Sequence, residues 1–333
     1  MKHNNKEILK YLGNYYNRIF IDIKKVKGTY KLLDKGNNLY ALKVVKYDFG
    51  HFYFILSAIL HLKKNNYNCI PEIIKTKNGE LYIKFNEYYA FLSQWIEGRV
   101  CNYNNDDELE KATLNLANMH IKSKNFLLNK EMNPRIYWFS WIDIFLTRKN
   151  EILDFKNRIK QKANKSEFDL YYMDNLKKQL EIADDSINGL INSNYTSVME
   201  RHIKKLEFCH HDYANHNLLI DHRNNIHLID FDYCILDSHL HDLSSIIIRN
   251  MKSGNWNNKK CANIIEKYSS IYPILDEELE VMKYFIMFPQ EFWQIGIQKY
   301  WEQQPYKEEK YIEKINRYIN DCDEKIKFLR DFF

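Results

Sequence analysis

The chain has 333 residues, of which 45% are hydrophobic and 28% are charged, and its formal net charge is +5. This length exceeds what one small core can organise, so it favours two domains or one large two-lobed fold. The mild positive charge suits an anionic ligand. However, the sequence has no basic run long enough for an arm and no nucleic-acid-binding motif, which argues against a nucleic-acid partner.

The cysteine spacing and the apolar runs indicate the compartment. The six cysteines form no C-x-x-C pair, which argues against a zinc site and against a disulfide framework. Reduced thiols in a cytoplasm are the expectation. Residues 1–10 are polar and lack the apolar core of a secretion signal, and the longest apolar runs are far below a membrane span. We therefore expect no membrane partner.

The first hundred residues predict a small antiparallel sheet with one main helix. Apolar residues near helical spacing predict a short amphipathic helix over 1–20, and residues 51–65 predict a second helix with one buried side. Lys35-Gly36-Asn37-Asn38 and Asn78-Gly79 are hairpin-turn sequences. The expected strands are 21–27, 29–33, 39–45, 73–77, 81–85 and 88–94.

Helices dominate the rest of the chain. We predict helices over 106–120, 138–155 and 168–191, with a polar turn over 156–167, and a mainly helical segment from residue 242 to the end. Two short strands, 207–210 and 226–229, flank a polar loop. The sequence thus predicts an α+β, two-lobed protein kinase-like fold with an N-terminal β-rich nucleotide-binding lobe (1–97) and a larger helical C-terminal lobe (98–333).

The polar loop carries the pattern that points most directly to a reaction. It reads His210-His211-Asp212, then Asn217, then Asp230-Phe231-Asp232. Protein kinases carry H-R-D-x-x-x-x-N and D-F-G in the same order. Asp212 would accept the proton of a substrate hydroxyl, and Asn217 and Asp230 would bind Mg²⁺, which prefers hard oxygen ligands. The expected reaction is transfer of the γ-phosphoryl group of ATP.

Lys43 is the second anchor of this interpretation. Ala41-Leu42-Lys43-Val44 resembles the kinase strand V-A-I-K, whose lysine pairs with the α- and β-phosphates. A lysine in a strand is more often a solvated residue. Its place on the third expected strand, just before the helix, favours the phosphate role. Histidines also crowd the loop region, but at such spacings they are more often surface or hydrogen-bonded core residues than metal ligands.

The loop resembles that of the aminoglycoside phosphotransferase and choline kinase group. Residues 210–217 are similar to the group's H-G-D-x-x-x-x-N, and Ile229-Asp230-Phe231-Asp232 is similar to its I-D-F-[DE]. Residues 116–120 are similar to its L-A-x-L-H helix. Asp242-Leu243 resembles a step at which an aspartate steadies the loop. The resemblance implies ATP and Mg²⁺ as cofactors, with the backbone of Gln94, Trp95 and Ile96 facing the adenine.

A narrower resemblance covers nearly the whole chain. Residues 54–62, the stretch Gln94-Trp95-Ile96-Glu97-Gly98-Arg99 and residues 288–300 look like the CotS-type spore coat proteins, which belong to the same kinase-like group in spore-forming Firmicutes. This resemblance implies expression in the mother cell cytoplasm during sporulation and deposition in the spore coat, with other coat proteins as partners. It implies no particular acceptor substrate.

The sequence departs from the group's pattern at three places. His211 stands where the group usually has glycine, and the only glycine near a nucleotide-binding loop is Gly28. The helix over 51–65 holds no glutamate to pair with Lys43, as active kinases require. Asp48 and Glu72, both outside that helix, are the alternative acids.

Two functions follow. The first is an active phosphotransferase that uses ATP and Mg²⁺ and acts on a hydroxyl of a small molecule or sugar, with the acceptor against the helical lobe. The tryptophans of that lobe, which are more often core than substrate contacts, are Trp138, Trp141, Trp293 and Trp301. The alternative is a catalytically weak or inactive kinase fold that serves as a structural component of the coat. The missing helix glutamate and His211 favour the alternative.

Overall fold

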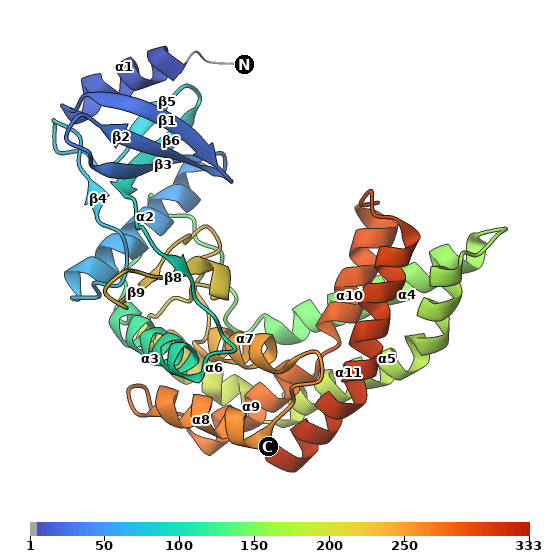
Figure 1. Ribbon diagram of the computed structural model, residues 1–333. Coiled ribbons are helices and arrows are strands. Elements are labelled where there is room, and N and C mark those ends of the chain that lie inside the picture. Colours follow the sequence, from blue (N-terminus) through green and yellow to red (C-terminus); the bar gives the residue numbers. More distant parts are fainter. Residues whose placement is uncertain (1–4) are drawn as a thin grey trace. The chain divides into compact units, whose positions relative to one another are not determined.

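The computed structural model describes residues 5–333 (Figure 1). The first four residues of the helix expected over 1–20 lie outside this range. The chain separates into two compact units. Unit 1 runs to Arg135 and includes Asp212–Ile235, and unit 2 comprises Ile136–His211 and Leu236–Phe333. Unit 1 therefore contains residues that follow the lobe boundary expected at residue 97, and that boundary stays a prediction.

Unit 1 is built on an antiparallel sheet with strand order β1-β2-β3-β6-β4, in which β5 also pairs with β6. All six expected strands are present, and β4 and β5 are shorter than predicted. The expected turn between β2 and β3 forms because the Asp34 carboxylate accepts the backbone N–H groups of Gly36 and Asn38. The strands are β1 (Phe20–Val26), β2 (Thr29–Asp34), β3 (Leu39–Val45), β4 (Ile73–Ile74), β5 (Ile83–Phe85) and β6 (Tyr88–Gln94).

Two helices cover this sheet. Helix α1 (Asn5–Tyr16) contributes Leu12 and Tyr16 to a core shared with β1, β2, β3, β5 and β6. Helix α2 (Phe49–Lys64) follows β3 and buries Phe52 and Leu56 against Val45 and Phe91. The N-cap of α2 is Asp48, whose carboxylate accepts the His51 backbone N–H at 3.0 Å.

A second, three-stranded sheet completes unit 1 and positions the motif loop. Its order is β7 (Arg99–Val100), β8 (Leu218–Ile220) and β9 (Ile226–Leu228). Strand β9 was predicted, whereas β7 and β8 were not. The bidentate ion pair of Arg99 with Glu108, at 2.7 and 2.8 Å, ties β7 to α3 (Asp106–Ser123).

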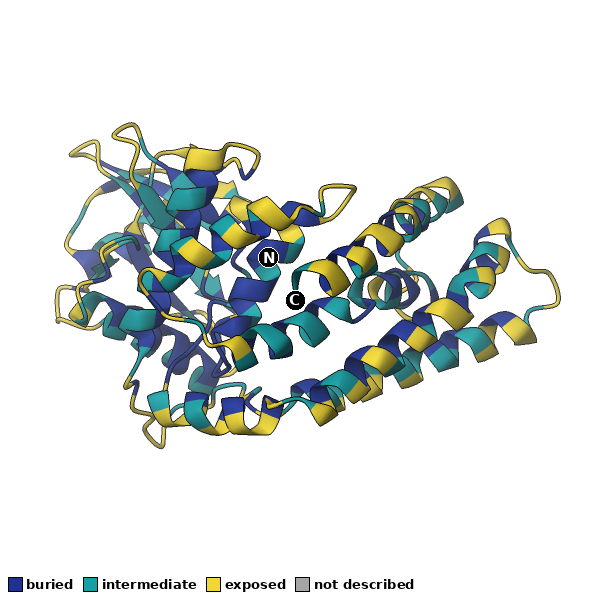
Figure 2. Ribbon diagram, turned by 90° about the horizontal axis from the view of Figure 1, so that it is seen from below, coloured by how far each residue is buried: buried dark blue, intermediate teal, exposed yellow. Residues whose placement is uncertain are grey.

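Unit 2 is helical. Its helices expose polar stripes and bury apolar ones, visible as alternating yellow and dark blue bands in Figure 2. Helix α5 packs on α4, α9 and α11, and α10 packs on α4 and α11. The helices are α4 (Trp141–Gln161), α5 (Glu167–Asn192), α6 (Tyr195–Lys205), α7 (Leu240–Met251), α8 (Asn258–Ser269), α9 (Asp276–Met287), α10 (Gln290–Gly296) and α11 (Glu308–Phe332), with a π-helical turn over Ile297–Trp301 after α10.

Two predictions in this region were wrong. The polar turn expected over 156–167 is shorter, because α4 continues to Gln161 and buries Ile159 on the same side as Ile152 and Phe155. Residues 207–210 form no strand and contain a single bridge residue, Cys209. No disulfide joins the cysteines of the described residues. Over the same residues, no helix is long and apolar enough to cross a membrane.

Candidate active site

Lys43 lies on β3, as the strand pattern predicted, and its side chain is 18% exposed. Its Nζ lies 2.6 Å from Oδ1 of Asp230 and 2.8 Å from Oδ1 of Asp232. Neither alternative acid forms an ion pair with Lys43: the Asp48 carboxylate caps α2, and the charge of Glu72 interacts with Lys63. Among residues 5–333, the two acids that form ion pairs with Lys43 therefore both come from the D-F-D segment.

Asp230 has an unusual backbone. Its φ is +67°, in the left-handed region that non-glycine residues seldom adopt, although aspartate tolerates it better than most. Such a conformation costs of order 1–3 kcal/mol and persists where surrounding contacts impose it. The preceding residue, Ile229, donates its N–H to the Asn217 carbonyl at 3.0 Å. This bond holds the D-F-D segment against the end of the motif loop.

Buried hydrogen bonds to helix α3 hold the loop that carries Asp212. The hydroxyl of Tyr213 donates to the Ala112 carbonyl of α3 at 2.8 Å and accepts from the Asn115 amide at 3.0 Å. Asn217 is 3% exposed, and its Nδ2 donates to both the backbone oxygen and Oδ2 of Asp212 at 2.9 Å. The structure thus brings Asp212 and Asn217 together and turns the Asn217 amide oxygen away from Asp212.

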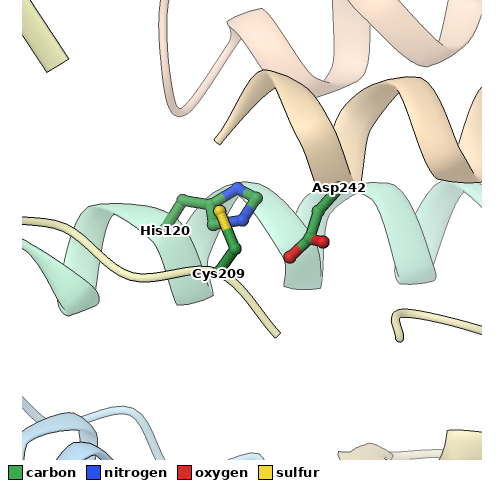
Figure 3. Close-up of side chains that lie close together, drawn as sticks. All are labelled: His120, Cys209 and Asp242. Carbon is green, nitrogen blue, oxygen red and sulfur yellow. The ribbon is translucent and has the colours of Figure 1, made fainter. Parts of the chain in front are cut away.

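His211 and its neighbours belong to unit 2. Asp242, at the start of α7, accepts the backbone N–H groups of His210 (2.8 Å) and His211 (3.0 Å), which is the steadying role expected for it. Figure 3 shows its carboxylate beside Cys209, the residue before His210. His211 has a φ of +66°, which explains why glycine suits this position, and its ring stacks on His241 at 3.9 Å.

A cavity of about 1650 Å³ opens in unit 1 around these groups. Its wall includes the turn between β1 and β2, so a short hairpin with Gly28 occupies the place expected for a Gly-rich loop. Asp212 does not line the cavity itself and is joined to it through Asn217. The site residues on its wall are Lys43, Gln94, Trp95, Ile96, Asn217, Asp230 and Asp232.

The residues of the segment that follows β6 differ in whether their backbone N–H groups already donate a hydrogen bond within the protein. The Gln94 N–H bonds to the Glu72 carbonyl at 2.9 Å, and the Trp95 N–H bonds to the Leu39 carbonyl at 3.0 Å. Within the described chain, no intramolecular acceptor is found for the Ile96 N–H. Of the three predicted residues, Ile96 is thus the one whose N–H remains for a ligand.

Sequence reasoning missed three residues of the site. Tyr47 donates its hydroxyl to Asp232 at 2.9 Å, and Arg135 donates to the Asp232 backbone carbonyl at 3.0 Å. Burial, reinforced by the charge of Asp232, raises the pKa of Tyr47, so its hydroxyl stays protonated. Asp232 itself was read only as part of the D-F-D pattern. The absence of a helix glutamate was the available signal that another acid must pair with Lys43.

Most of the tryptophans and histidines considered as candidates are buried or hydrogen-bonded within the protein, as structural residues are. Trp138 and Trp141 are buried, and the indole N–H of Trp141 donates to Asp237. Trp293 donates to Glu151, and Trp301 is 45% exposed. Among the histidines near the loop, His239 bonds to Glu207 at 2.8 Å inside unit 2, which fits the hydrogen-bonded core expected for such residues.

A protein family and a curated protein are similar to most of the chain. A family model described as "Spore coat putative kinase YutH" matches residues 10–332. Spore coat protein S of Bacillus subtilis (strain 168) is 22% identical over 281 residues, which cover 83% of this chain and 78% of that protein.

Solved structures share the fold. An aminoglycoside phosphotransferase from Alicyclobacillus acidocaldarius aligns with a TM-score of 0.84 at 15% identity, over 96% of this chain and 93% of that one. The AMP-bound spectinomycin phosphotransferase APH(9)-Ia aligns with a TM-score of 0.67 at 14% identity, over 97% of each chain. Amicoumacin kinase, in complex with AMP-PNP and Ca²⁺, gives 0.68 at 12% identity over 97% and 94%. The expected kinase-like α+β fold is confirmed.

Proposed function

The chain belongs to the spore coat YutH family, and from this premise we propose that it is a spore coat-associated phosphotransferase that uses ATP and Mg²⁺. The acceptor is a hydroxyl of a small molecule or sugar. The observation that carries the proposal is the contact of Lys43 with Asp230 on the wall of a cavity that also holds Asn217. We also propose that the protein is made in the mother cell and deposited in the coat with other coat proteins.

The donor set fits a magnesium ion. Asp230 offers carboxylate oxygens, and Asn217 offers an amide oxygen because its nitrogen is committed to Asp212. Hard oxygen ligands of this kind suit Mg²⁺, which keeps several waters and needs few protein ligands. When bound, the ion would offset the negative charge on the phosphates during transfer.

The residues of the chain then have distinct tasks. Lys43 pairs with the α- and β-phosphates, and the Ile96 N–H, with the carbonyls of Gln94 and Ile96, binds the adenine edge. Asp212 orients the acceptor hydroxyl and takes its proton as the hydroxyl oxygen bonds to the γ-phosphorus and the bond from that phosphorus to the β-phosphate oxygen breaks, which releases ADP. The spectinomycin phosphotransferase and amicoumacin kinase structures contain nucleotides, which supports nucleotide binding here.

The test compares wild type with Asp212→Asn and Asp230→Asn, and uses Asp22→Asn, an exposed change on β1, as the control. Mg-ATP binding is measured by calorimetry, and transfer of the γ-phosphate is measured against sugars, amino alcohols and aminoglycosides. We expect Asp212→Asn to retain Mg-ATP binding and lose about 10²-fold or more in transfer rate. We expect Asp230→Asn to lose the Mg²⁺ dependence of binding.

The outcomes separate the two functions. If wild type neither binds Mg-ATP nor exceeds the variants in transfer, the enzyme proposal fails. The alternative, a kinase fold that acts as a structural coat component, is favoured by the lack of an acidic residue in α2. This structural alternative is supported if ATP binds and no acceptor is phosphorylated.

A further inference from the structure

The segment after β9 presents two carboxylates to one lysine, and they are not equivalent. Asp230 and Asp232 lie 2.6 and 2.8 Å from the Lys43 Nζ, so both could serve as its partner. A kinase-like site needs one acid to hold the lysine and another to bind the metal, because one carboxylate bound to Mg²⁺ cannot also fix the lysine in the same way. In active kinases the first task belongs to a glutamate of the helix after the lysine strand.

Helix α2, which follows β3 here, cannot supply that acid. Its sequence over Phe49–Lys64 contains no aspartate or glutamate. Its cap, Asp48, is committed to the His51 N–H. The link that precedes the helix contributes Tyr47 instead, whose ring packs edge-on against the His51 ring with 5.1 Å between the ring centroids and whose hydroxyl donates to Asp232.

Asp232 is held from several directions. Its carboxylate contacts Lys43 (2.8 Å) and accepts the Tyr47 hydroxyl (2.9 Å), and its backbone carbonyl accepts from Arg135 (3.0 Å). Asp230 has the strained left-handed backbone and a more exposed side chain, 46% against 34% for Asp232. A carboxylate fixed by a hydroxyl and a lysine suits an anchor, and an exposed one on the cavity wall suits a metal ligand.

From these contacts we propose that Asp232 takes the place of the missing helix glutamate and is the positioning residue for Lys43, which leaves Asp230 to the metal. Tyr47 supports Asp232, so the link between β3 and α2 and the D-F-D segment together perform the task that a helix performs in other kinases. This inference rests on the proposed nucleotide site and names how that site is held ready.

The sharpest test compares Asp232→Asn with Asp230→Asn, because each removes one negative charge at a similar distance from Lys43. ADP binding is measured by calorimetry in EDTA, so no metal contributes. Loss of charge alone would strengthen binding of an anionic nucleotide, and Asp230→Asn is expected to do that or to have no effect. Asp232→Asn is expected to weaken binding about tenfold, or ~1.4 kcal/mol, because Lys43 loses its anchor.

Two further variants test the connection through Lys43. Lys43→Gln should weaken metal-free ADP binding, and adding Asp232→Asn to it should weaken binding no further, since an anchor has no function without the lysine. Tyr47→Phe should shift binding in the same direction as Asp232→Asn but less, and Tyr82→Phe is its control outside the cavity wall. If Asp232→Asn behaves like Asp230→Asn, with metal-free ADP binding unchanged or stronger and the Mg²⁺ dependence of binding lost, Asp232 is a second metal ligand and the inference is overturned.

A nucleotide-free measurement keeps the inference separate from the proposed function. If wild type binds no ADP, the nucleotide proposal fails, and the anchor is then judged by thermal unfolding of wild type, Lys43→Gln, Asp232→Asn and the double variant. Non-additive shifts in Tm support a direct Lys43–Asp232 coupling, and additive shifts reject it.

Discussion

At the scale of single residues, unit 2 contains a buried network of ionisable groups, none of which lines the cavity. Nδ1 of His239 lies 2.8 Å from Glu207, whose other carboxylate oxygen accepts the Tyr272 hydroxyl, and His202 bonds to Glu278 at 2.7 Å. Burial raises the pKa of Glu278, but the hydrogen bond with His202 is the largest of the effects that outweigh burial and bring that pKa to about 2. Buried charges of this kind are tolerable only with such partners.

His239 should make the protein less stable in mild acid. Burial lowers its pKa from 6.5 to about 3, so the folded state stays neutral while the unfolded state takes up a proton. The free energy of unfolding therefore falls as pH drops from 6.5 toward 3, by ~1.4 kcal/mol per pH unit for this group. Asp237, whose pKa burial raises to about 6, acts in the opposite sense.

Because Asp237 opposes this effect, the test compares the wild type with a variant that lacks His239. Urea unfolding of wild type and His239→Asn is compared at pH 7.5 and pH 5.5. We expect wild type to lose more free energy of unfolding than the variant between the two pH values, because asparagine keeps a donor for Glu207 and has no proton to gain. Equal losses in the two proteins would contradict the assignment.

At the scale of elements, tertiary packing determined where α4 ends and where β8 forms, which the local sequence did not determine. Residues 156–161 are polar enough to suggest a turn, yet the spacing of Ile152, Phe155 and Ile159 already marked one continuous helical face, and the structure buries all three. The strand β8 was missed because its three residues directly follow Asn217 and gain strand geometry only by pairing with β7 and β9. Such pairing is set by tertiary contacts.

At the contact of α5 with α9, one substitution tests whether close side-chain packing outweighs the higher helix propensity of alanine. A Cβ atom at Gly189 in α5 would lie 2.1 Å from Cδ1 of Tyr284 in α9. Alanine gains up to ~1 kcal/mol over glycine in a helix, but overpacking costs ~1–3 kcal/mol. We expect Gly189→Ala to lower the free energy of unfolding in urea. The exposed neighbour Asn188→Ala should change it by less than ~0.5 kcal/mol, and a stabilised Gly189→Ala protein would refute the close packing.

At the scale of the whole molecule, the order of motifs was enough to predict the fold class, and six of the seven predicted site residues line one cavity, whereas Asp212 does not. Lys43, Asn217 and Asp230 are far apart in sequence, and the structure of unit 1 brings them to one cavity. The partner of Lys43 was not predictable. Both Asp230 and Asp232 reach the lysine, and the left-handed backbone of Asp230 and the Tyr47 hydrogen bond to Asp232 have no one-residue sequence signature.

Because the cavity residues all belong to unit 1, nucleotide binding should act unevenly on the chain. A ligand that binds only the folded site adds RT ln(1 + [L]/Kd) to the free energy of any opening that destroys the site, ~2.7 kcal/mol at 100 times Kd. Hydrogen exchange with and without Mg²⁺ and AMP-PNP should therefore slow most in the cavity-lining residues, which are 25–31, 93–98, 216, 217, 219 and 229–232.

Helices α4 and α5 contain no residue of that wall, so their amides should change least. The Asp230→Asn protein under the same conditions is the control, because it lacks the carboxylate assigned to the metal and should show weaker slowing in the same segments. Slowing that is confined to unit 2 would place the nucleotide elsewhere. Slowing of residues 93–98 that persists in Asp230→Asn would instead separate adenine binding, which needs only the Ile96 backbone, from the metal-dependent grip on the phosphates.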